Sequence, residues 1–199
     1  MQHLEIKKEL AKVIRTAYSK GWITSRDGNV SFRSSDEFYI TESGVLKSEI
    51  TEKQVIQSIF VDDVLLFTKD SPTPSGELSM HLALQTPTKS RSVLHLHPTY
   101  TVAAMHRGFD LMKLASEFPE VYRYTKVGPT VPKYAALSEE LARVTREMMT
   151  KDDQIIYDIV GQVSHGVCSV AETPSKALEH VERLEHICQI VLASGVNPS

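Results

Sequence analysis

Two histidines lie one residue apart in the stretch SVLHLHPTY, at positions 95 and 97. The stretch is apolar and runs into a proline, so it is expected to form a buried strand. Residues two positions apart in a strand point to the same face, so His95 and His97 would project together with Val93. Leu94 and Leu96 would point to the opposite face. Two neutral imidazoles on one face pack poorly into a core, but they are a good beginning for a metal site.

A catalytic zinc site typically has three protein ligands and one open position, so a third ligand must come from elsewhere in the chain. His165 in GQVSHGVCS is the best candidate, because it follows the apolar run IIYDIV and would be fixed at a strand edge. Glu77, expected in the first turn of a helix, is a candidate fourth ligand or proton-transferring base. These residue types predict a divalent metal. Zinc is the first choice, with manganese, cobalt, nickel and magnesium as alternatives, because imidazole and carboxylate suit several ions.

Three short loops combine glycine with hydroxyl or amide side chains: DGNVSFR, TESGV and Ser75-Gly76. Glycine lets backbone N–H groups approach an anion closely, and asparagine and serine add donors. Ordinary turns have the same composition, so each loop by itself is also explained as a turn. Three such loops beside a candidate metal site suggest a small phosphorylated substrate.

The elements that must position these residues follow from hydrophobic periodicity and from turn and cap residues. Strands occur in mixed order with only occasional helices between them, which favours an α/β fold with a largely antiparallel sheet. The expected helices are 3–20 ending at Gly21, 77–86 with Ser75 as N-cap, 99–108, 138–149 capped by Ser138, and one from Thr173 to Gly195; the expected strands are 30–33, 38–41, one or two within 53–68 with a turn at Asp62-Asp63, 91–98 and two within 153–172.

Composition limits the remaining possibilities. The chain has 199 residues, of which 41% are hydrophobic and 24% charged, as expected for one globular domain spanning residues 1–199. The net charge of −3 gives no electrostatic reason to expect nucleic acid as a partner. No apolar run is long enough for a membrane span, and the first residues do not resemble a signal peptide. With two cysteines and no disulfide pattern, the sequence predicts a cytoplasmic location.

The ordered motifs GNVS, TESG, PSGELSMH, HLHP and SHG resemble those of the class II aldolase/adducin family over roughly residues 5–192. This resemblance implies a three-layer α/β fold, with a central mainly antiparallel sheet flanked by helices. It also implies a homotetramer with active sites at subunit interfaces. The metal ligands would be His95, His97 and His165. Glu77 would bind the metal in the resting site and act as the catalytic base.

The resemblance also assigns the substrate side of the site. A tyrosine from the neighbouring subunit would donate a proton, and either Tyr124 or Tyr122 lies in the corresponding region, with Tyr124 as the first choice. The chain departs from the family pattern at Glu42, where proline is usual, at Gly76, where a second serine is common, and at Ser164, where asparagine is usual. The implied phosphate-binding residues are Asn29, Ser43, Gly44, Ser75 and Gly76.

The activity implied is that of a metal-dependent aldolase in carbohydrate metabolism. It would cleave or form a carbon–carbon bond in an L-fuculose-1-phosphate-like sugar phosphate, giving dihydroxyacetone phosphate and an aldehyde through a metal-stabilised enediolate. The glutamate at position 77 and the proline after the second histidine favour the aldolases over the epimerases of the family. Decarboxylase, sugar-phosphate dehydratase and epimerase activities remain alternatives. A non-enzymatic adducin-like module is disfavoured because such modules lack the metal-binding set.

Overall fold

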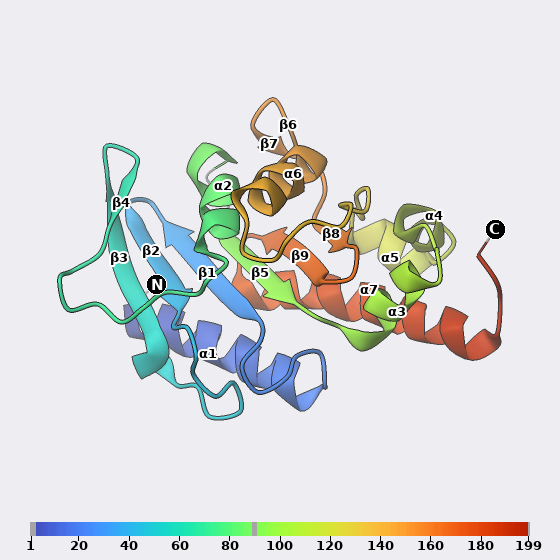
Figure 1. Cartoon of the computed structure of the whole chain (residues 1–199), viewed down its shortest axis with the longest axis horizontal. Coiled ribbons are helices and arrows are strands. Elements are labelled where there is room, and N and C mark those ends of the chain that lie inside the picture. Colours follow the sequence, from blue (N-terminus) through green and yellow to red (C-terminus); the bar gives the residue numbers. More distant parts are fainter. Residues whose placement is uncertain (1–2, 89–90, 199) are drawn as a thin grey trace.

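The computed structural model describes residues 3–88 and 91–198. Its centre is a seven-stranded antiparallel sheet with strand order β4-β3-β2-β1-β5-β9-β8 (Figure 1). A separate two-stranded hairpin, β6-β7, stands apart from it. The strands are β1 (Asn29–Ser34), β2 (Glu37–Thr41), β3 (Val55–Val61), β4 (Val64–Leu66), β5 (Ser92–Leu96), β6 (Thr150–Lys151), β7 (Gln154–Ile155), β8 (Ile159–Gln162) and β9 (Gly166–Ala171).

Helices cover both faces of the sheet, which gives three layers. The helices α1 and α7 pack on one face, α2 and α6 pack on the other, and α3 to α5 gather near one end of α7 (Figure 1). The expected α/β fold with an antiparallel central sheet is therefore confirmed. The helices are α1 (His3–Ser19), α2 (Leu78–Thr88), α3 (Thr99–His106), α4 (Leu111–Ser116), α5 (Pro119–Tyr124), α6 (Glu139–Met149) and α7 (Pro174–Ser194), with a short 3-10 helix η1 (Glu52–Gln54).

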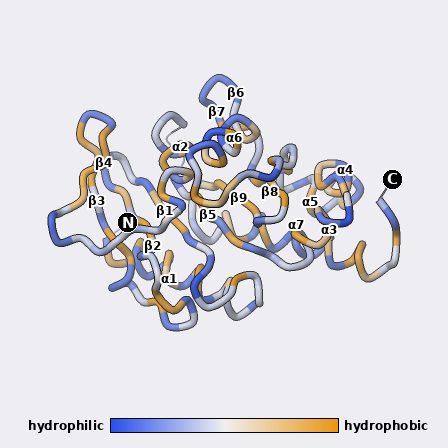
Figure 2. Tube along the Cα trace, in the orientation of Figure 1, coloured by the Kyte–Doolittle hydropathy of each residue, from blue (hydrophilic) through white to orange (hydrophobic). Residues whose placement is uncertain are grey.

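The two faces of β5 contribute to different hydrophobic clusters, as the alternation in its sequence predicts. Leu94 and Leu96 belong to the large core between the sheet and helices α1 and α7. Val93 belongs to the cluster beneath α2 and α6. Figure 2 shows hydrophobic residues along the central strands and hydrophilic residues at loops such as the β6-β7 tip. Because side chains alternate along a strand, His95 lies on the same side as Val93, facing α2 and α6.

Several local predictions are confirmed by the backbone. The turn between β3 and β4 lies at Asp62 and Asp63, both in the left-handed region with φ of 49° and 60°. The Oγ1 atom of Thr173 caps α7 by accepting a hydrogen bond from the Lys176 N–H, and Gly195 ends the helix with φ of 74°. None of the helices in the described part of the chain is long and apolar enough to cross a bilayer.

The start of α2 differs from the prediction. The helix begins at Leu78, so Ser75 is not its N-cap and Glu77 is not in its first turn. Instead, Ser75 opens a tight turn in which its carbonyl accepts a hydrogen bond from the Leu78 N–H at 3.1 Å. Its Oγ accepts a hydrogen bond from the Glu77 N–H at 3.3 Å. Glu77 therefore lies just before the helix, in a turn whose backbone is fixed by these two hydrogen bonds to Ser75.

Helices α4 and α5 and the hairpin β6-β7 were not predicted. Each helix is six residues long, and each strand of the hairpin only two, which is too short for periodicity to reveal. The Asp110 side chain starts α4 by accepting hydrogen bonds from the N–H groups of Met112 and Lys113. The one-turn helices are stabilised by packing beside α7 rather than by intrinsic propensity.

The packing of α7 leads to a testable stability difference between two of its residues. Leu184 is fully buried in the core, whereas Ile190 is 41% exposed. We expect Leu184→Ala to lower the free energy of unfolding by about 2–5 kcal/mol, because it leaves a cavity in a close-packed core. Ile190→Ala is the matched control and should cost less than about 1 kcal/mol. Urea denaturation measures both, and equal losses would contradict the assigned face of α7.

Candidate metal and substrate site

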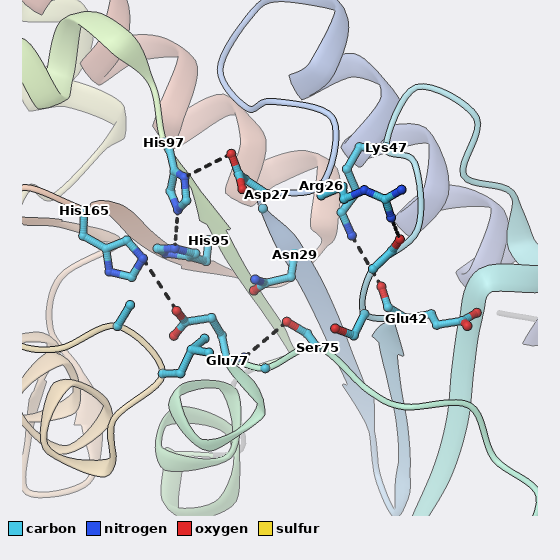
Figure 3. Close-up of a pocket in the computed structure, with 16 residues that line it drawn as sticks. Arg26, Asp27, Asn29, Glu42, Lys47, Ser75, Glu77, His95, His97 and His165 are labelled. Carbon is cyan, nitrogen blue, oxygen red and sulfur yellow. Dashed lines mark hydrogen bonds and ion pairs between the residues drawn. The ribbon is translucent and has the colours of Figure 1, made fainter.

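Three histidines from two segments of the chain meet at one end of the sheet (Figure 3). His95 is on β5, His97 follows that strand directly, and His165 lies in the three-residue turn between β8 and β9. The pairing of β5 with β9, in which Leu96 is opposite Val167, brings this turn beside His97. The ring centroids of His95 and His165 are 4.6 Å apart, and those of His97 and His165 are 5.1 Å apart. The predicted triad is thus assembled from residues 70 positions apart.

Two features of the turn allow this approach. A Cβ added to Gly166 would lie 2.3 Å from the Leu96 carbonyl oxygen and 2.7 Å from Cδ2 of His97, so only glycine fits there. Ser164 has φ of 59°, in the left-handed region that asparagine tolerates better than most residues. This explains physically why asparagine suits the position that Ser164 occupies. The turn is closed by a hydrogen bond from the His165 N–H to the Gln162 carbonyl at 3.0 Å.

The donor set fits a divalent metal ion. The Nδ1–H of His95 donates to the Val167 carbonyl at 3.0 Å, which leaves its Nε2 lone pair facing Nε2 of His97 at 2.9 Å. Nδ1 of His165 is buried and finds no hydrogen-bond partner in the described chain. One potential ligand atom from each histidine lies within 4.8 Å of the others. Two nitrogens bound to one tetrahedral zinc lie about 3.3 Å apart, so small side-chain movements suffice for these residues to hold such an ion.

Burial keeps the three imidazoles neutral, as metal ligands must be. Desolvation lowers the pKa of His97 to about 4, helped by the neighbouring His165 and opposed by Asp27. Desolvation also lowers the pKa of His95 well below its usual value and lowers that of His165. The Asp27 carboxylate lies 4.0 Å from Nδ1 of His97, on the side away from His95. It can therefore orient the His97 ring as an outer partner.

Glu77 reaches the triad from the other side of the cavity (Figure 3). Its Oε1 is 3.6 Å from Nε2 of His165, and its side chain is buried. Burial raises the pKa of this carboxyl group, while a backbone hydrogen bond from Leu137 acts in the opposite direction. A carboxylate with a raised pKa beside a potential metal position can serve as a ligand or as a proton-transferring base.

The three glycine-containing loops converge on the same cavity, which has a volume of about 300 Å³. A β-bridge joins Glu42 to Pro74, and two backbone hydrogen bonds flank it, from the Ser43 N–H to Thr73 and from the Ser75 N–H to Thr41. This short ladder holds the loops side by side. All five predicted phosphate-binding residues line the cavity together with the histidines and Glu77: Asn29, Ser43, Gly44, Ser75 and Gly76.

Two basic residues lie at the end of the cavity formed by the glycine-containing loops, and neither was predicted from the sequence. Lys47 is only 2% exposed, and its Nζ donates to the Glu42 carbonyl at 3.4 Å. Desolvation lowers the pKa of Lys47, whereas Asp27 and Glu42 raise it. Arg26 donates to the Gly44 carbonyl. Lys47 follows Gly44 by three positions, which was an available signal, but nothing in the sequence separates it from a surface lysine.

The two candidate tyrosines lie on α5, outside the lining of this cavity. Tyr122 and Tyr124 are 72% and 58% exposed, and the Arg183 guanidinium stacks over the Tyr124 ring at 5.5 Å. Neither is among the described residues that line the cavity. Their assignment as proton donors stays a prediction, and it requires a second copy of the chain to present one of them.

Comparison with known proteins agrees with this geometry. Residues 8–192 match the class II aldolase and adducin N-terminal domain, so the chain belongs to this family. An L-fuculose phosphate aldolase of Methanococcus maripaludis is 27% identical over 92% of this chain and 93% of its own length. A bifunctional methylthioribose-1-phosphate isomerase/methylthioribulose-1-phosphate dehydratase of Nocardia farcinica is 24% identical over 94% of this chain, which spans only 35% of that protein.

A solved structure shows the same fold at low sequence identity. The sugar-phosphate aldolase from Thermotoga maritima superposes with a TM-score of 0.80 at 23% identity, covering 98% of this chain and 97% of that one. The family and the architecture expected from the motifs are therefore confirmed. The relatives carry the names of different reactions, so membership in the family does not select one of them.

The histidine triad makes a prediction about metal content. His97→Ala removes one of three ligands, so we expect zinc affinity to fall about 100-fold or more. Removal of even an outer-shell partner commonly costs 10–100-fold. His106→Ala is the matched control, because His106 is exposed at the end of α3 and outside the triad. Calorimetric zinc titration of both variants is the measurement. Full zinc affinity in His97→Ala would refute the ligand set.

The lowered histidine pKa values predict how the metal-free protein responds to acid. His97 and the fully buried His81 have pKa values of about 4 and about 3, against 6.5 for free histidine. Between pH 6.5 and pH 4 the unfolded chain binds protons that these two imidazoles do not bind when folded. The free energy of unfolding should therefore decrease as the pH is lowered, by about 1.4 kcal/mol per pH unit for each such histidine.

Urea denaturation in the presence of a chelator at several pH values between 7 and 5 measures this dependence. His97→Asn removes one of these titrating imidazoles, so the dependence on pH should become shallower. A free energy of unfolding that stays constant over this range would contradict the buried neutral state of these side chains.

Proposed function

We propose that the protein is a metal-dependent lyase of the aldolase type that acts on a small sugar phosphate, with zinc as the first choice of metal. The observation that carries the proposal is the position of Glu77. Its buried carboxylate lies 3.6 Å from a triad histidine, in a cavity whose other end is formed by the glycine-containing loops and Lys47. This small cavity therefore has a base beside a metal position at one end and positively charged groups for an anion at the other. Such an arrangement fits the deprotonation of a phosphorylated ketone.

Each group has a separate task in this reaction. The divalent ion held by His95, His97 and His165 would supply Lewis-acid polarisation of the substrate carbonyl, which makes the adjacent carbon acidic. Lys47 and Arg26, with the hydroxyl groups of Ser43 and Ser75, would bind the phosphate and fix the substrate in the cavity.

Glu77 moves the proton at the nucleophilic carbon. In the direction of synthesis it takes a proton from the hydroxymethyl carbon of dihydroxyacetone phosphate, and the resulting carbanion attacks the aldehyde carbon. The aldehyde oxygen then takes a proton from an acid, for which Tyr124 or Tyr122 of a neighbouring subunit is our candidate. Cleavage reverses these steps: the carbon–carbon bond breaks, and Glu77 returns the proton to carbon. General acid–base catalysis of this kind contributes roughly 10²–10⁴-fold.

The tyrosine assignment is the reason to expect an oligomer. Both tyrosines are on the exposed surface of α5 and outside the cavity of their own chain. We propose a homotetramer in which the site is completed across a subunit interface. Sedimentation analysis would test the assembly, and a monomer with full activity would exclude this role for the tyrosines.

A dehydratase is the second candidate, and the similarity to the Nocardia bifunctional protein over 94% of this chain favours it. The same base would take the proton from the carbon next to the carbonyl, and the hydroxyl group one carbon further would leave as water. The cavity residues described here serve both reactions. Decarboxylase, epimerase and adducin-like roles have no specific structural observation in their favour.

The first experiment is proton exchange. The zinc-loaded protein is incubated with dihydroxyacetone phosphate in heavy water, and the hydroxymethyl protons are followed by NMR with and without a chelator. Stereospecific exchange that the chelator abolishes is expected for an aldolase and needs no knowledge of the aldehyde. No exchange, together with water loss from methylthioribulose 1-phosphate, would replace the aldolase with the dehydratase. Neither reaction from a metal-loaded protein would count against both.

Glu77→Gln separates metal binding from proton transfer. The amide keeps the size of the side chain and an oxygen donor but has no basic site. We therefore expect zinc to be retained while exchange and turnover fall by at least about 100-fold. Glu172→Gln, which changes a carboxylate at the far end of β9, is the matched control. Near-normal turnover of Glu77→Gln would remove Glu77 from the mechanism.

A further inference from the structure

A chain of buried polar side chains runs behind the cavity, away from the proposed metal position. It begins at Asn29 on β1, passes through His81 on α2 and Ser31 on β1, and ends at Gln85 on α2. The His81 ring lies 2.6 Å from the Asn29 amide and 2.6 Å from Ser31 Oγ. Ser31 Oγ is 2.7 Å from Gln85 Oε1, and all four residues are buried. These contacts are short, so each of them must join one donor to one acceptor.

The Gln85 end of this row of side chains determines which group donates in each hydrogen bond. The Gln85 Nε2 group donates to the Arg91 backbone carbonyl at 3.1 Å, and a carbonyl can only accept. The other end of the Gln85 amide is therefore the oxygen, which accepts the hydroxyl hydrogen of Ser31. A serine has one such hydrogen, so Ser31 Oγ cannot also donate to His81. It must accept a hydrogen bond from His81, and the proton of the His81 ring is on Nδ1.

This proton leaves Nε2 of His81 as a bare acceptor. The ring is fully buried, and desolvation lowers its pKa to about 3, so it carries one proton only. The neighbour of Nε2 must consequently be a donor. The oxygen and nitrogen of an asparagine amide have nearly the same shape, so the atom placed as Oδ1 beside His81 is identified by its partner. At this position it is the NH₂ group.

We infer that His81 is a positioning residue that turns the Asn29 side-chain carbonyl oxygen toward the cavity, where it accepts a hydrogen bond from a substrate hydroxyl group. This inference rests on the proposed function for the identity of the substrate, but not for the orientation of the amide.

The position of Asn29 indicates where the hydroxyl group would lie. Asn29 is opposite His95 in the register of β1 and β5, and it lines the cavity. In Figure 3 it lies between the histidine triad and Ser75, at the border of the phosphate-binding end. The acceptor is therefore expected to select substrates that carry a hydroxyl group beside the carbonyl, over otherwise identical phosphates without one.

Neutron diffraction from crystals of the full chain exchanged into heavy water tests the orientation directly. The expected result is deuterium on Nδ1 of His81, none on its Nε2, and the ND₂ group of Asn29 facing His81. Deuterium on Nε2, with the Asn29 oxygen facing it, would overturn the inference. This readout does not depend on catalysis, so it decides the orientation even if the proposed activity is wrong.

Gln85→Met tests the order of donors and acceptors among these side chains, and Gln85 itself does not contact Asn29. Without the Gln85 acceptor, the Ser31 hydroxyl is free to donate to His81, so the Nε2–H form should appear in the same neutron experiment. Gln162→Met is the matched control. It removes a buried glutamine that is hydrogen-bonded to Thr145 and is not one of the four hydrogen-bonded side chains. An unchanged His81 proton position in Gln85→Met would show that Gln85 does not fix the direction.

Calorimetry on the zinc-loaded proteins tests the consequence for specificity. Dihydroxyacetone phosphate is compared with hydroxyacetone phosphate, which lacks the terminal hydroxyl group. We expect the preference for the hydroxylated compound to fall about threefold to tenfold in Gln85→Met relative to the unmodified chain, the range of one neutral hydrogen bond. The same preference in both proteins, despite a changed His81 proton position, would refute the hydroxyl contact. If neither compound bound, the proposed function would fail while the neutron result still stood.

Discussion

The pairing of β5 with its two neighbours is the constraint on which the site depends. Antiparallel register places His95 opposite Asn29 on β1 and opposite Cys168 on β9. The same register brings the turn that carries His165 against His97. A slip of one residue would turn His95 into the core beneath α1 and α7 and would bring Leu94 or Leu96 to the site. Two large hydrophobic clusters, one on each face, make such a slip costly, so the packing of the whole sheet fixes the triad.

Burial has opposite consequences at the two ends of the cavity. At the histidine end it favours uncharged imidazoles, whose lone pairs are then free for a cation, and it raises the pKa of Glu77. At the other end it holds Lys47 beneath the glycine-containing loops, where the charge of an anionic ligand would offset the cost of its desolvation. The cavity is therefore suited to a ligand with a carbonyl or hydroxyl group at one end and a negative charge at the other.

A common deprotonation step would allow one site of this kind to serve either of the two proposed reactions. An aldolase and a dehydratase both need a proton removed beside a polarised carbonyl, and both need the phosphate held at a fixed distance from that carbon. The reactions diverge only in which bond breaks next. We expect that choice to depend on further groups that contact the substrate, such as the exposed Leu137 at the cavity.

The sequence by itself determined the family, the antiparallel fold and most of the polar residues that gather in the cavity. It did so because strand alternation, glycine positions and the order of the motifs are local properties that leave a trace at each position. His95 and His97 share a face for that reason. Sequence could not reveal α4, α5 or the β6-β7 hairpin, because elements of one turn or two residues are stabilised by their neighbours. It misplaced the start of α2, because the turn at Ser75 depends on contacts with β2. It also missed Lys47 and the direction of the chain through His81, since burial and the order of hydrogen bonds exist only once distant segments have met.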